Sequence, residues 1–376
     1  MEIEEFKLER LQSVWENTVE INLTESGIHP YTLRELLQPE EIERLLDLRL
    51  TYGCTNGSPR LREAIAAYYP STTRANVLVT NGSAEANFLA AWTLVSPGDE
   101  VVVMVPNYLQ IWGLARSLGA VVKPFHLRES TGWAPDLDEL RRQLSKRTKM
   151  ICLCYPNNPT GALLSRREME TVVELAEEAG AVVYADEVYK GAELDGEEGP
   201  SFRDLTDRAI VASGLSKSLA HPGLRLGWLV GPEDFIAAAW HRHDYTTIAP
   251  GQLSQQVACT ILDPGRRQEI LARNREILRR NRDLLSAWIE ERSETFSWIP
   301  PRAGGMAFLR YRAPFGSTEL FDYLRRKKSL LILPGDVYGM DGYFRLGLGE
   351  PTEVLQRGLA RLAEGFAELA EEGGVR

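Results

Sequence analysis

The chain has 376 residues, of which 44% are hydrophobic and 26% are charged. This composition excludes an intrinsically disordered chain and is enough for one large or two closely joined domains. The 43 Lys and Arg residues face 53 Asp and Glu residues, which gives a formal net charge of -10. An acidic chain is a poor candidate for nonspecific nucleic-acid binding, so we expect a cytoplasmic protein with a small-molecule site.

The first ten residues are charged and lack the apolar run of a signal peptide, and no apolar run approaches the about 18 residues of a membrane span. The four cysteines are too few for a disulfide scaffold. Cys152 and Cys154 would point to one face of a strand, where we interpret them as packing thiols. His241 and His243 form an H-x-H pattern without further ligands, so we predict no metal site.

Strands and helices are expected to alternate after an N-terminal part. Residues 1–50 are typical of charged helices, with a break at 26–30, and Ser58 before Pro59 marks a helix start. Continuous apolar runs predict strands buried on both faces of a parallel sheet. The expected strands are 77–79, 101–105, 120–125, 149–155, 181–185, 209–213 and 226–230, and the helices between them are 84–95, 107–118, 136–145 and 165–179. This alternation predicts an α/β domain with a mainly parallel sheet.

The pattern changes after about residue 232 to that of a smaller α+β region. We expect helices at 265–292, 317–328 and 352–372, and strands at 296–300, 306–311 and 330–333. Three segments follow from this reading. Residues 1–50 would pack with the small domain, 51–250 would form the large domain, and 251–376 would form a connecting helix and the small domain.

Polar residues follow three successive strands of the expected sheet. No P-loop and no G-x-G-x-x-G after the first strand is present, so a nucleotide site has little support. Ligands of open α/β sheets bind at the carboxyl ends of strands, which makes these polar residues candidates. They are Asn157-Asn158-Pro159-Thr160-Gly161, Asp186-Glu187-Val188-Tyr189 and Ser216-Lys217.

Lys217 and Arg225 indicate the chemistry of the ligand. Lys217 lies among small residues near a strand end, and Arg225 lies inside an expected apolar strand, where an unpaired charge is costly. We therefore expect an anion beside Arg225. A lysine close to an arginine-bound anion suggests a cofactor with an aldehyde and a phosphate, and pyridoxal 5'-phosphate (PLP) has both.

The combined motifs resemble the class I/II aminotransferases of fold type I, the aspartate aminotransferase superfamily of PLP enzymes. In chain order they are N-N-P-T-G, D-E-V-Y, S-K-x7-R-x-G-W and F-R-L, and the resemblance covers about residues 20 to 370. It implies a large domain with a mainly parallel mixed sheet flanked by helices, a smaller α+β domain, and a homodimer with shared active sites.

The resemblance also implies catalytic roles. Lys217 would form the Schiff base with PLP and then act as the base that moves the α-proton. Asp186 would pair with the pyridine nitrogen and make the ring an electron sink. Asn158 and Tyr189 would donate hydrogen bonds to the phenolic oxygen of the ring, and Tyr108 would stack on the ring.

The phosphate of PLP would lie at the start of the helix after the first strand, where free N–H groups and the helix dipole favour an anion. Ser83 and the backbone of Ala84 are the expected donors, although Ser83 also suits a plain helix cap. Ser216 and Arg225 would complete the phosphate site. Tyr52 resembles the tyrosine that reaches the phosphate of the partner subunit.

Fewer residues indicate the substrate. Arg345 matches the arginine that grips the substrate α-carboxylate, and Asn158 and Gly27 are expected beside it. Residues 244–247 lie where the partner subunit often contacts the substrate. No second arginine for a dicarboxylic side chain is evident, so the sequence does not support aspartate specificity.

Two departures keep alternatives open. Gly214 stands where the family often has serine, so Ser213 or Ser216 would have to supply a phosphate hydroxyl. Residues 25–32 also resemble, locally, the capreomycidine synthases, PLP enzymes of this fold that eliminate a hydroxyl and close a ring on an arginine derivative.

We therefore predict an aminotransferase acting on an amino acid and a 2-oxo acid. A PLP enzyme of elimination, replacement or cyclisation is the alternative. A regulator with this fold would carry an N-terminal DNA-binding module, for which the first 50 residues are too few and too acidic.

Overall fold

The computed structural model describes residues 3–373. The helices are α1 (Lys7–Trp15), α2 (Leu33–Leu36), α3 (Pro39–Leu46), α4 (Pro59–Ala66), α5 (Ser83–Leu94), α6 (Gln110–Ser117), α7 (Leu137–Gln143), α8 (Arg166–Ala179), α9 (Glu233–His243), α10 (Gln252–Ile261), α11 (Pro264–Glu290), α12 (Ser317–Lys328) and α13 (Thr352–Gly373). The strands are β1 (Ile21–Asn22), β2 (Val77–Thr80), β3 (Glu100–Val105), β4 (Val121–Arg128), β5 (Ala134–Pro135), β6 (Thr148–Cys154), β7 (Val182–Asp186), β8 (Ile210–Gly214), β9 (Gly227–Val230), β10 (Phe296–Trp298), β11 (Met306–Tyr311), β12 (Leu330–Leu331), β13 (Leu333–Pro334) and β14 (Tyr343–Gly347).

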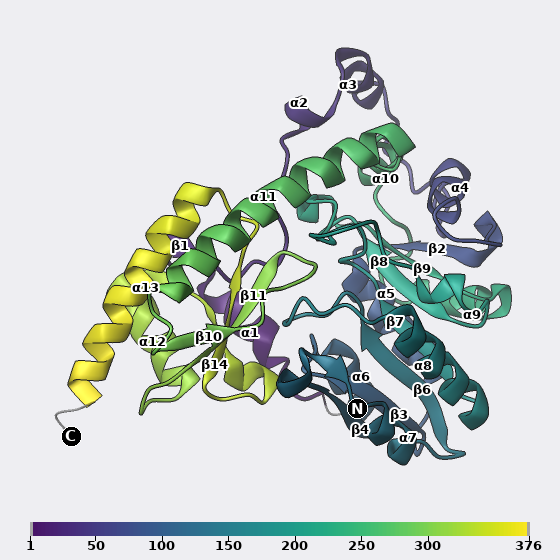
Figure 1. The fold of residues 1–376 in the computed structure, drawn as a ribbon. Helices are drawn as coiled ribbons and strands as arrows, with labels where there is room; N and C mark the ends of the chain where they lie inside the picture. The colour runs from purple at the N-terminus through teal and green to yellow at the C-terminus, as the bar shows by residue number, and fades with distance from the viewer. Residues whose placement is uncertain (1–2, 374–376) are drawn as a thin grey trace.

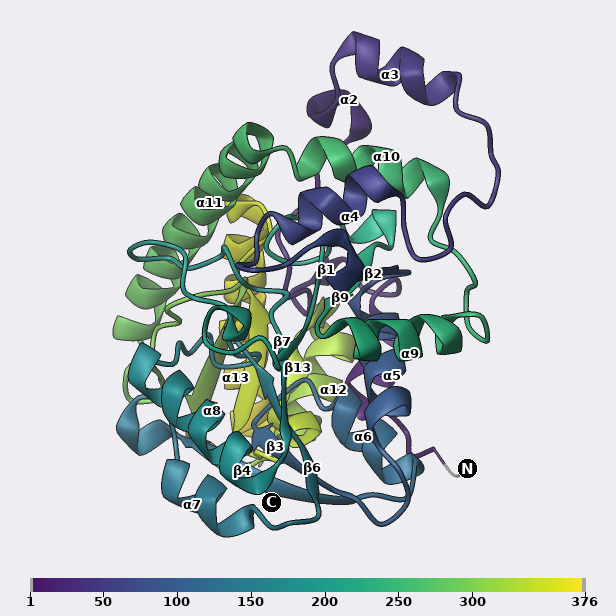
Figure 2. The same ribbon diagram turned by 90° about the vertical axis from the view of Figure 1, so that its right-hand side faces the viewer.

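The large sheet has the strand order β2-β9-β8-β7-β6-β3-β4-β5. Its central strands are parallel, while β9 runs antiparallel to both β2 and β8. Val102 and Val103 are buried in different hydrophobic clusters on the two faces of the sheet. Helices flank the sheet on both sides (Figure 2). Burial of both faces explains the uninterrupted apolar strands and confirms the predicted α/β sheet.

A smaller region holds the antiparallel sheet β10-β11-β14-β13. In Figure 1, α12 and α13 cover this region, and α11 runs from the neighbourhood of α10 toward α13. The two-residue strand β1 pairs in parallel with β12, so residues 21–22 join a segment more than 300 residues further along the chain.

Two sequence predictions about these elements are wrong. Residues 1–50 are not uniformly helical, because β1 lies between α1 and α2. The single strand expected at 330–333 is divided between β12 and β13, which belong to different sheets. Both errors concern strands of two residues, which are too short to show a period. The division of the chain into segments 1–50, 51–250 and 251–376 stays a prediction.

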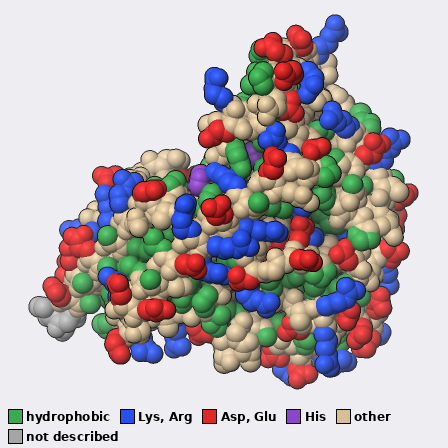
Figure 3. Space-filling model, turned by 45° about the horizontal axis from the view of Figure 1, so that its top comes forward, with side chains coloured by type: hydrophobic (Ala, Val, Ile, Leu, Met, Phe, Trp, Pro, Cys, Tyr) green, Lys and Arg blue, Asp and Glu red, His purple; other side chains and the backbone are tan. Residues whose placement is uncertain are grey.

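The surface is charged (Figure 3), and the helices of residues 3–373 are not those of a membrane protein's spanning segments in length and apolar character. Acidic and basic side chains are interspersed over the face drawn in Figure 3. Among residues 3–373, none of the helices combines the length and the apolar character needed to cross a bilayer.

Candidate active site

A small cavity lies at the carboxyl ends of β6 and β7, under α1 and beside β14. The predicted site residues that line it are Ser83, Tyr108, Asn158, Asp186, Tyr189, Lys217 and Arg345. Its other lining residues are Leu8, Glu9, Gln12, Ser26, Cys154 and Val188. The fold thus brings together residues from the large sheet, the smaller sheet and the N-terminal segment.

Asp186 ends β7 and is 8% exposed. One carboxylate oxygen accepts a hydrogen bond from Asn87 Nδ2 at 3.1 Å, and the other accepts one from the backbone N–H of Val188 at 3.3 Å. Burial raises the pKa of Asp186 to about 6, while these hydrogen bonds and the charge of Lys217 oppose the rise. Asp186 is therefore a buried carboxyl group that a cationic partner would hold ionised.

Lys217 follows the end of β8, and its side chain is 28% exposed. Its Nζ atom lies 3.7 Å from Oε2 of Glu25, a residue that the sequence analysis gave no role. Gly27 packs against the backbone of the lysine segment, because a Cβ atom there would lie 3.0 Å from the carbonyl oxygen of Ser216. Ser216 is itself buried. The N-terminal segment thus closes over the lysine.

Arg345 lies in the centre of β14 and is 1% exposed. Its Nη1 atom donates to Asn158 Oδ1 at 2.9 Å, and its Nη2 atom donates to the carbonyl oxygen of Thr24. Its Nε atom is buried and has no hydrogen-bond partner in the described part of the chain. A buried donor without a partner is costly, so this arginine is suited to an anionic ligand.

Two tyrosines complete the walls of the cavity. Tyr189 is 2% exposed, and its hydroxyl donates to Ser26 Oγ at 2.8 Å. Tyr108 donates to the carboxylate of Glu9 on α1, and its ring meets that of Phe6 edge to face at 5.0 Å. Burial raises the pKa of both hydroxyls well above the ordinary value, so both stay protonated donors.

The start of α5 is shaped for an anion. Gly82 occupies the N-cap with φ +82°, so the plain cap reading of Ser83 is wrong. A Cβ atom at Gly82 would lie 2.5 Å from Arg225 Nη2, and one at Gly227 would lie 2.5 Å from the Ser83 nitrogen. Only glycine allows this close approach of a guanidinium to a helix N-terminus, and both groups favour a phosphate.

Arg225 corrects one step of the sequence argument. It does not lie inside a strand, since β9 begins at Gly227 and Arg225 is exposed, with φ +49°. Its Nη1 atom donates to the carbonyl oxygen of Pro222 at 3.1 Å. Arg225 is therefore not a buried charge, and the argument from the cost of burial does not apply to it. We expect an anion there because Arg225 packs against Gly82 at the start of α5.

These residues fit PLP: an amine, a buried carboxyl group and an anion site lie around one cavity. Residues 24–362 match the family described as aminotransferase class I and II. The chain belongs to this family. It is a fold type I protein of the PLP-dependent aminotransferases, with PLP as its cofactor.

Individual relatives agree with this assignment. Capreomycidine synthase of Streptomyces vinaceus is 34% identical over 347 residues, which cover 91% of this chain and 89% of that protein. Aspartate aminotransferase of Pyrococcus horikoshii is 28% identical over 346 residues, 86% of this chain and 85% of that protein. A solved PLP-dependent aminotransferase from Streptococcus suis has a TM-score of 0.92 at 34% identity and covers 98% of this chain and 99% of its own.

Other predicted residues of this aminotransferase-family chain lie outside the cavity lining. Tyr52 is 75% exposed, and the structure does not bring it to the cavity of its own chain. The carbonyl oxygen of Ala84 accepts a hydrogen bond from Gln110 Nε2 at 3.0 Å. The Ser213 hydroxyl donates to the carbonyl oxygen of Glu187 at 3.2 Å, so its proton is already used within the protein.

Segment 244–247 is tied to the start of α5. Glu85 Oε1 accepts hydrogen bonds from Thr246 Oγ1 at 2.5 Å and from Thr247 Oγ1 at 2.8 Å. His243 is fully buried, and its Nε2 atom lies 3.4 Å from Glu85 Oε2. No group of three or more His, Cys, Asp or Glu in residues 3–373 could hold a metal ion. The burial of His243 and its contact with Glu85 place it in the packing of this segment.

Cys152 and Cys154 are buried and share one face of β6, as predicted, with Cys154 opposite Asp186 in the sheet register. Burial is the main cause that raises the pKa of both thiols above the ordinary value. Protonated, buried thiols agree with the interpretation as packing residues.

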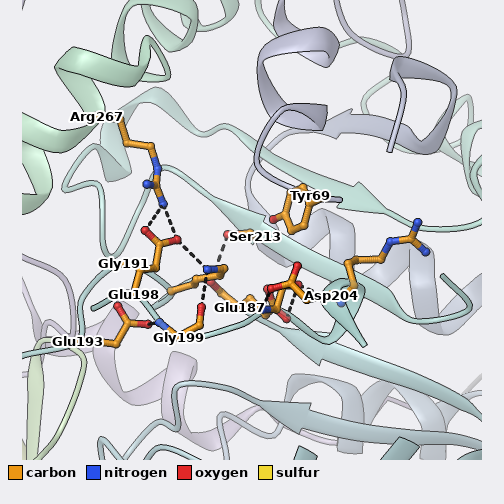
Figure 4. Close-up of polar contacts among 12 residues, drawn as sticks. Tyr69, Glu187, Gly191, Glu193, Glu198, Gly199, Asp204, Ser213 and Arg267 are labelled. Atoms are coloured by element: carbon orange, nitrogen blue, oxygen red, sulfur yellow. Dashed lines mark hydrogen bonds and ion pairs between the residues drawn. The ribbon is translucent and has the colours of Figure 1, made fainter. Parts of the chain in front are cut away.

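A group of buried and partly buried charged side chains supports the loop that follows Asp186 (Figure 4). Glu187 is fully buried, and its Oε1 atom accepts hydrogen bonds from Ser201 Oγ and the Phe202 N–H, each at 2.9 Å. Burial raises the pKa of Glu187 to about 7. Glu198 accepts two hydrogen bonds from Arg267 Nη2, at 2.8 and 2.9 Å. These contacts join α11 and the loop 187–205 behind the site.

Sequence reasoning missed several residues of the site. Asn87 is a buried amide on the otherwise apolar face of α5, and that polarity was the available signal. Glu9, Gln12 and Glu25 carried no such signal, because they look like ordinary residues of a charged N-terminal segment.

Proposed function

We propose that the protein is a PLP-dependent aminotransferase that moves an amino group from an amino acid to a 2-oxo acid. The observation that carries the proposal is one cavity lined by Lys217, Asp186 and a buried Arg345 with an unpartnered donor. An amine, an acid and an anion receptor are what this chemistry needs from the protein.

The residues around the cofactor would divide the work. When bound, PLP supplies an electron-withdrawing ring that stabilises negative charge on the substrate α-carbon. The Asp186 carboxylate would hold the proton on the ring nitrogen, and Lys217 Nζ would take and return the proton of the α-carbon. Because Arg345 occupies the amide oxygen of Asn158, the Asn158 Nδ2 group is left to donate to the phenolic oxygen. Tyr189 would donate to the same oxygen if its hydroxyl proton turns away from Ser26, whose own hydroxyl can then donate to the tyrosine oxygen.

The phosphate and the substrate carboxylate would bind at separate places. Arg225, Ser83 and the N–H groups at the start of α5 would hold the phosphate, with Ser216 and the Ala84 backbone as further donors. Arg345 would bind the α-carboxylate of the substrate, which satisfies its buried Nε donor. Gly27 allows the N-terminal segment to approach Lys217 closely and would lie beside the bound substrate carboxylate.

We further propose a homodimer with shared sites. Helices α2 and α3 project from the body of the molecule in Figures 1 and 2. Large apolar side chains are exposed on α3, just after it and just after α9, with Leu46 at 73%, Leu50 at 78%, Tyr52 at 75% and Tyr245 at 78%. Exposed apolar groups of this kind are typical of an interface, and Tyr52 would reach the partner's phosphate site.

A second candidate function has its own support. Glu25 lies 3.7 Å from Lys217 Nζ, and an acid beside the catalytic lysine could protonate a leaving group. Capreomycidine synthase of Streptomyces vinaceus is a 34% identical relative. Elimination or ring closure from the same α-carbon chemistry is therefore the alternative reaction.

The test mixes the purified holoenzyme with single L-amino acids and follows the absorbance of the cofactor. Conversion to pyridoxamine phosphate, reversed by a 2-oxo acid, is the expected result, and the Lys217→Ala variant serves as the control without turnover. Release of ammonia without the pyridoxamine form would overturn transamination and favour elimination or cyclisation. The same assay with β-hydroxylated amino acids offers the alternative reaction its leaving group.

A further inference from the structure

Three carboxylates gather where the N-terminal segment covers the cavity. Glu9 on α1 lines the cavity, Glu16 follows the end of α1, and Glu25 lies beside Lys217. Burial raises the pKa of Glu16, and the charges of Glu25 and Glu9 raise it further. Glu16 is thus within electrostatic reach of both Glu9 and Glu25, and we name the three carboxylates the acidic rim.

The acidic rim is held in place by the site itself. The Glu9 carboxylate accepts a hydrogen bond from the Tyr108 hydroxyl. Glu25 follows Thr24, whose carbonyl oxygen accepts from Arg345 and whose hydroxyl accepts from Gln12 Nε2 at 3.0 Å. Hydrogen bonds to Tyr108 and Arg345 therefore fix the positions of Glu9 and of the residue before Glu25.

A second observation points to a ligand in the same cavity. Arg345 is 1% exposed and lines the cavity, and its buried Nε atom has no hydrogen-bond partner among residues 3–373. Lys217 is the other cation that lines the cavity. Since Lys217 is committed to the cofactor in the proposed function, the rim has no further cation among the lining residues.

We propose that the acidic rim makes the enzyme selective for α-amino acids whose side chain ends in a cation, with Glu9 and Glu25 as specificity-determining residues. This inference rests on the proposed function. The substrate carboxylate would bind Arg345, and the cationic end of the side chain would lie against the rim. A dicarboxylic amino acid would bring a fourth carboxylate to the three of the rim and would be disfavoured.

Arginine and citrulline test this proposal, because they have nearly the same shape and differ in charge. The measured quantity is the ratio of kcat/KM for the two amino acids in the cofactor-conversion assay. We expect arginine to be favoured by about tenfold to a hundredfold, the range of one charge-assisted hydrogen bond.

The variants Glu9→Gln and Glu25→Gln should each lower that ratio by about tenfold. Glutamine keeps an oxygen that accepts from Tyr108, and the ratio cancels any common effect on Lys217. Glu5→Gln is the matched control, since Glu5 lies on the same segment, is exposed, and forms no ion pair within residues 3–373. This control should leave the ratio unchanged.

A binding arm separates failure of this inference from failure of the proposed function. Dissociation constants for arginine and citrulline are measured by spectral titration of the PLP-loaded Lys217→Ala protein, which needs no turnover. Tighter binding of arginine, reduced by Glu9→Gln or Glu25→Gln in that background, supports the rim even if no amino acid is converted. Equal binding of the two amino acids, a preference for glutamate, or a ratio unchanged by both variants would overturn it.

Discussion

The two sides of the active site are built in different ways. The sheet side consists of Asp186, Asn158, Tyr189 and Lys217, which follow neighbouring strands of the large sheet. The cover side consists of α1, segment 22–28 and Arg345, which meet through contacts between distant parts of the chain. The Arg345 to Thr24 hydrogen bond joins residues 321 positions apart.

This difference separates the chemistry from the selection of substrate. The sheet side presents the amine, the acid and the ring donors, which every PLP enzyme of this type needs. The cover side presents the carboxylate receptor and the acidic rim, which would bind the substrate and not the cofactor. Substitutions on the sheet side should therefore affect turnover and cofactor binding, and substitutions on the cover side should affect substrate affinity.

Lys217→Ala should have the largest effect. Loss of the base at Nζ is expected to lower turnover on the order of 10³-fold or more, because proton transfer at the α-carbon loses its catalyst. The lysine side chain is partly exposed, so the melting temperature should change little. Steady-state rates and thermal melts of the two proteins check this. Turnover within tenfold of the parent would assign the base to another residue and break the comparison.

Asp186→Asn should lower turnover by about a hundredfold. The same substitution should raise the free energy of unfolding of the cofactor-free protein. The pKa of Asp186 is raised from 3.8 to about 6 in the folded protein, so its stabilising contribution is present below pH 4 and is lost as pH rises through 6. Asparagine does not ionise. The cofactor-free variant should thus be more stable than the parent at pH 8 by up to about 3 kcal/mol.

Denaturant unfolding of the cofactor-free proteins at pH 3.5 and pH 8 measures this difference. The two proteins should have similar stability at the lower pH. A variant that is less stable than the parent at both pH values would mean that the carboxylate is needed for folding rather than for the cofactor.

Arg345→Lys should raise KM by about tenfold to a hundredfold, since lysine lacks the planar fork that binds a carboxylate. The affinity for PLP should fall by a smaller factor than KM rises, because Arg345 would reach the cofactor only through its hydrogen bond to Asn158. KM from initial rates and the PLP dissociation constant from absorbance are the two measurements. A loss of PLP affinity as large as the change in KM would show that the two sides are not separable.

Glu187→Gln should have the smallest effect on turnover, because its carboxyl group bonds Ser201 and Phe202 behind the cavity. Burial raises its pKa from 4.5 to about 7, so the parent should lose stability as pH rises from 5 to 8. Glutamine should flatten that dependence while it keeps the acceptor oxygen. Unfolding free energies across this pH range test it, and an equally steep slope in the variant would contradict the assignment to Glu187.

Much of the sheet side could be predicted from the sequence. The apolar runs of β3, β6, β7 and β8 report burial on both faces, and polar motifs directly after such strands meet at one sheet edge. Asp186 and Lys217 are therefore found by local reading. Asn87 escaped this reading because its partner Asp186 lies 99 residues away in the chain.

The cover side was decided by tertiary structure. Glu9 and Glu25 become site residues only because β1 pairs with β12 and Arg345 binds the Thr24 carbonyl oxygen, which places the N-terminal segment over Lys217. Sequence periodicity reports which side of an element is buried, and motifs report which chemistry follows it. Neither reports the partner across a long loop, because that choice depends on the packing of the whole chain.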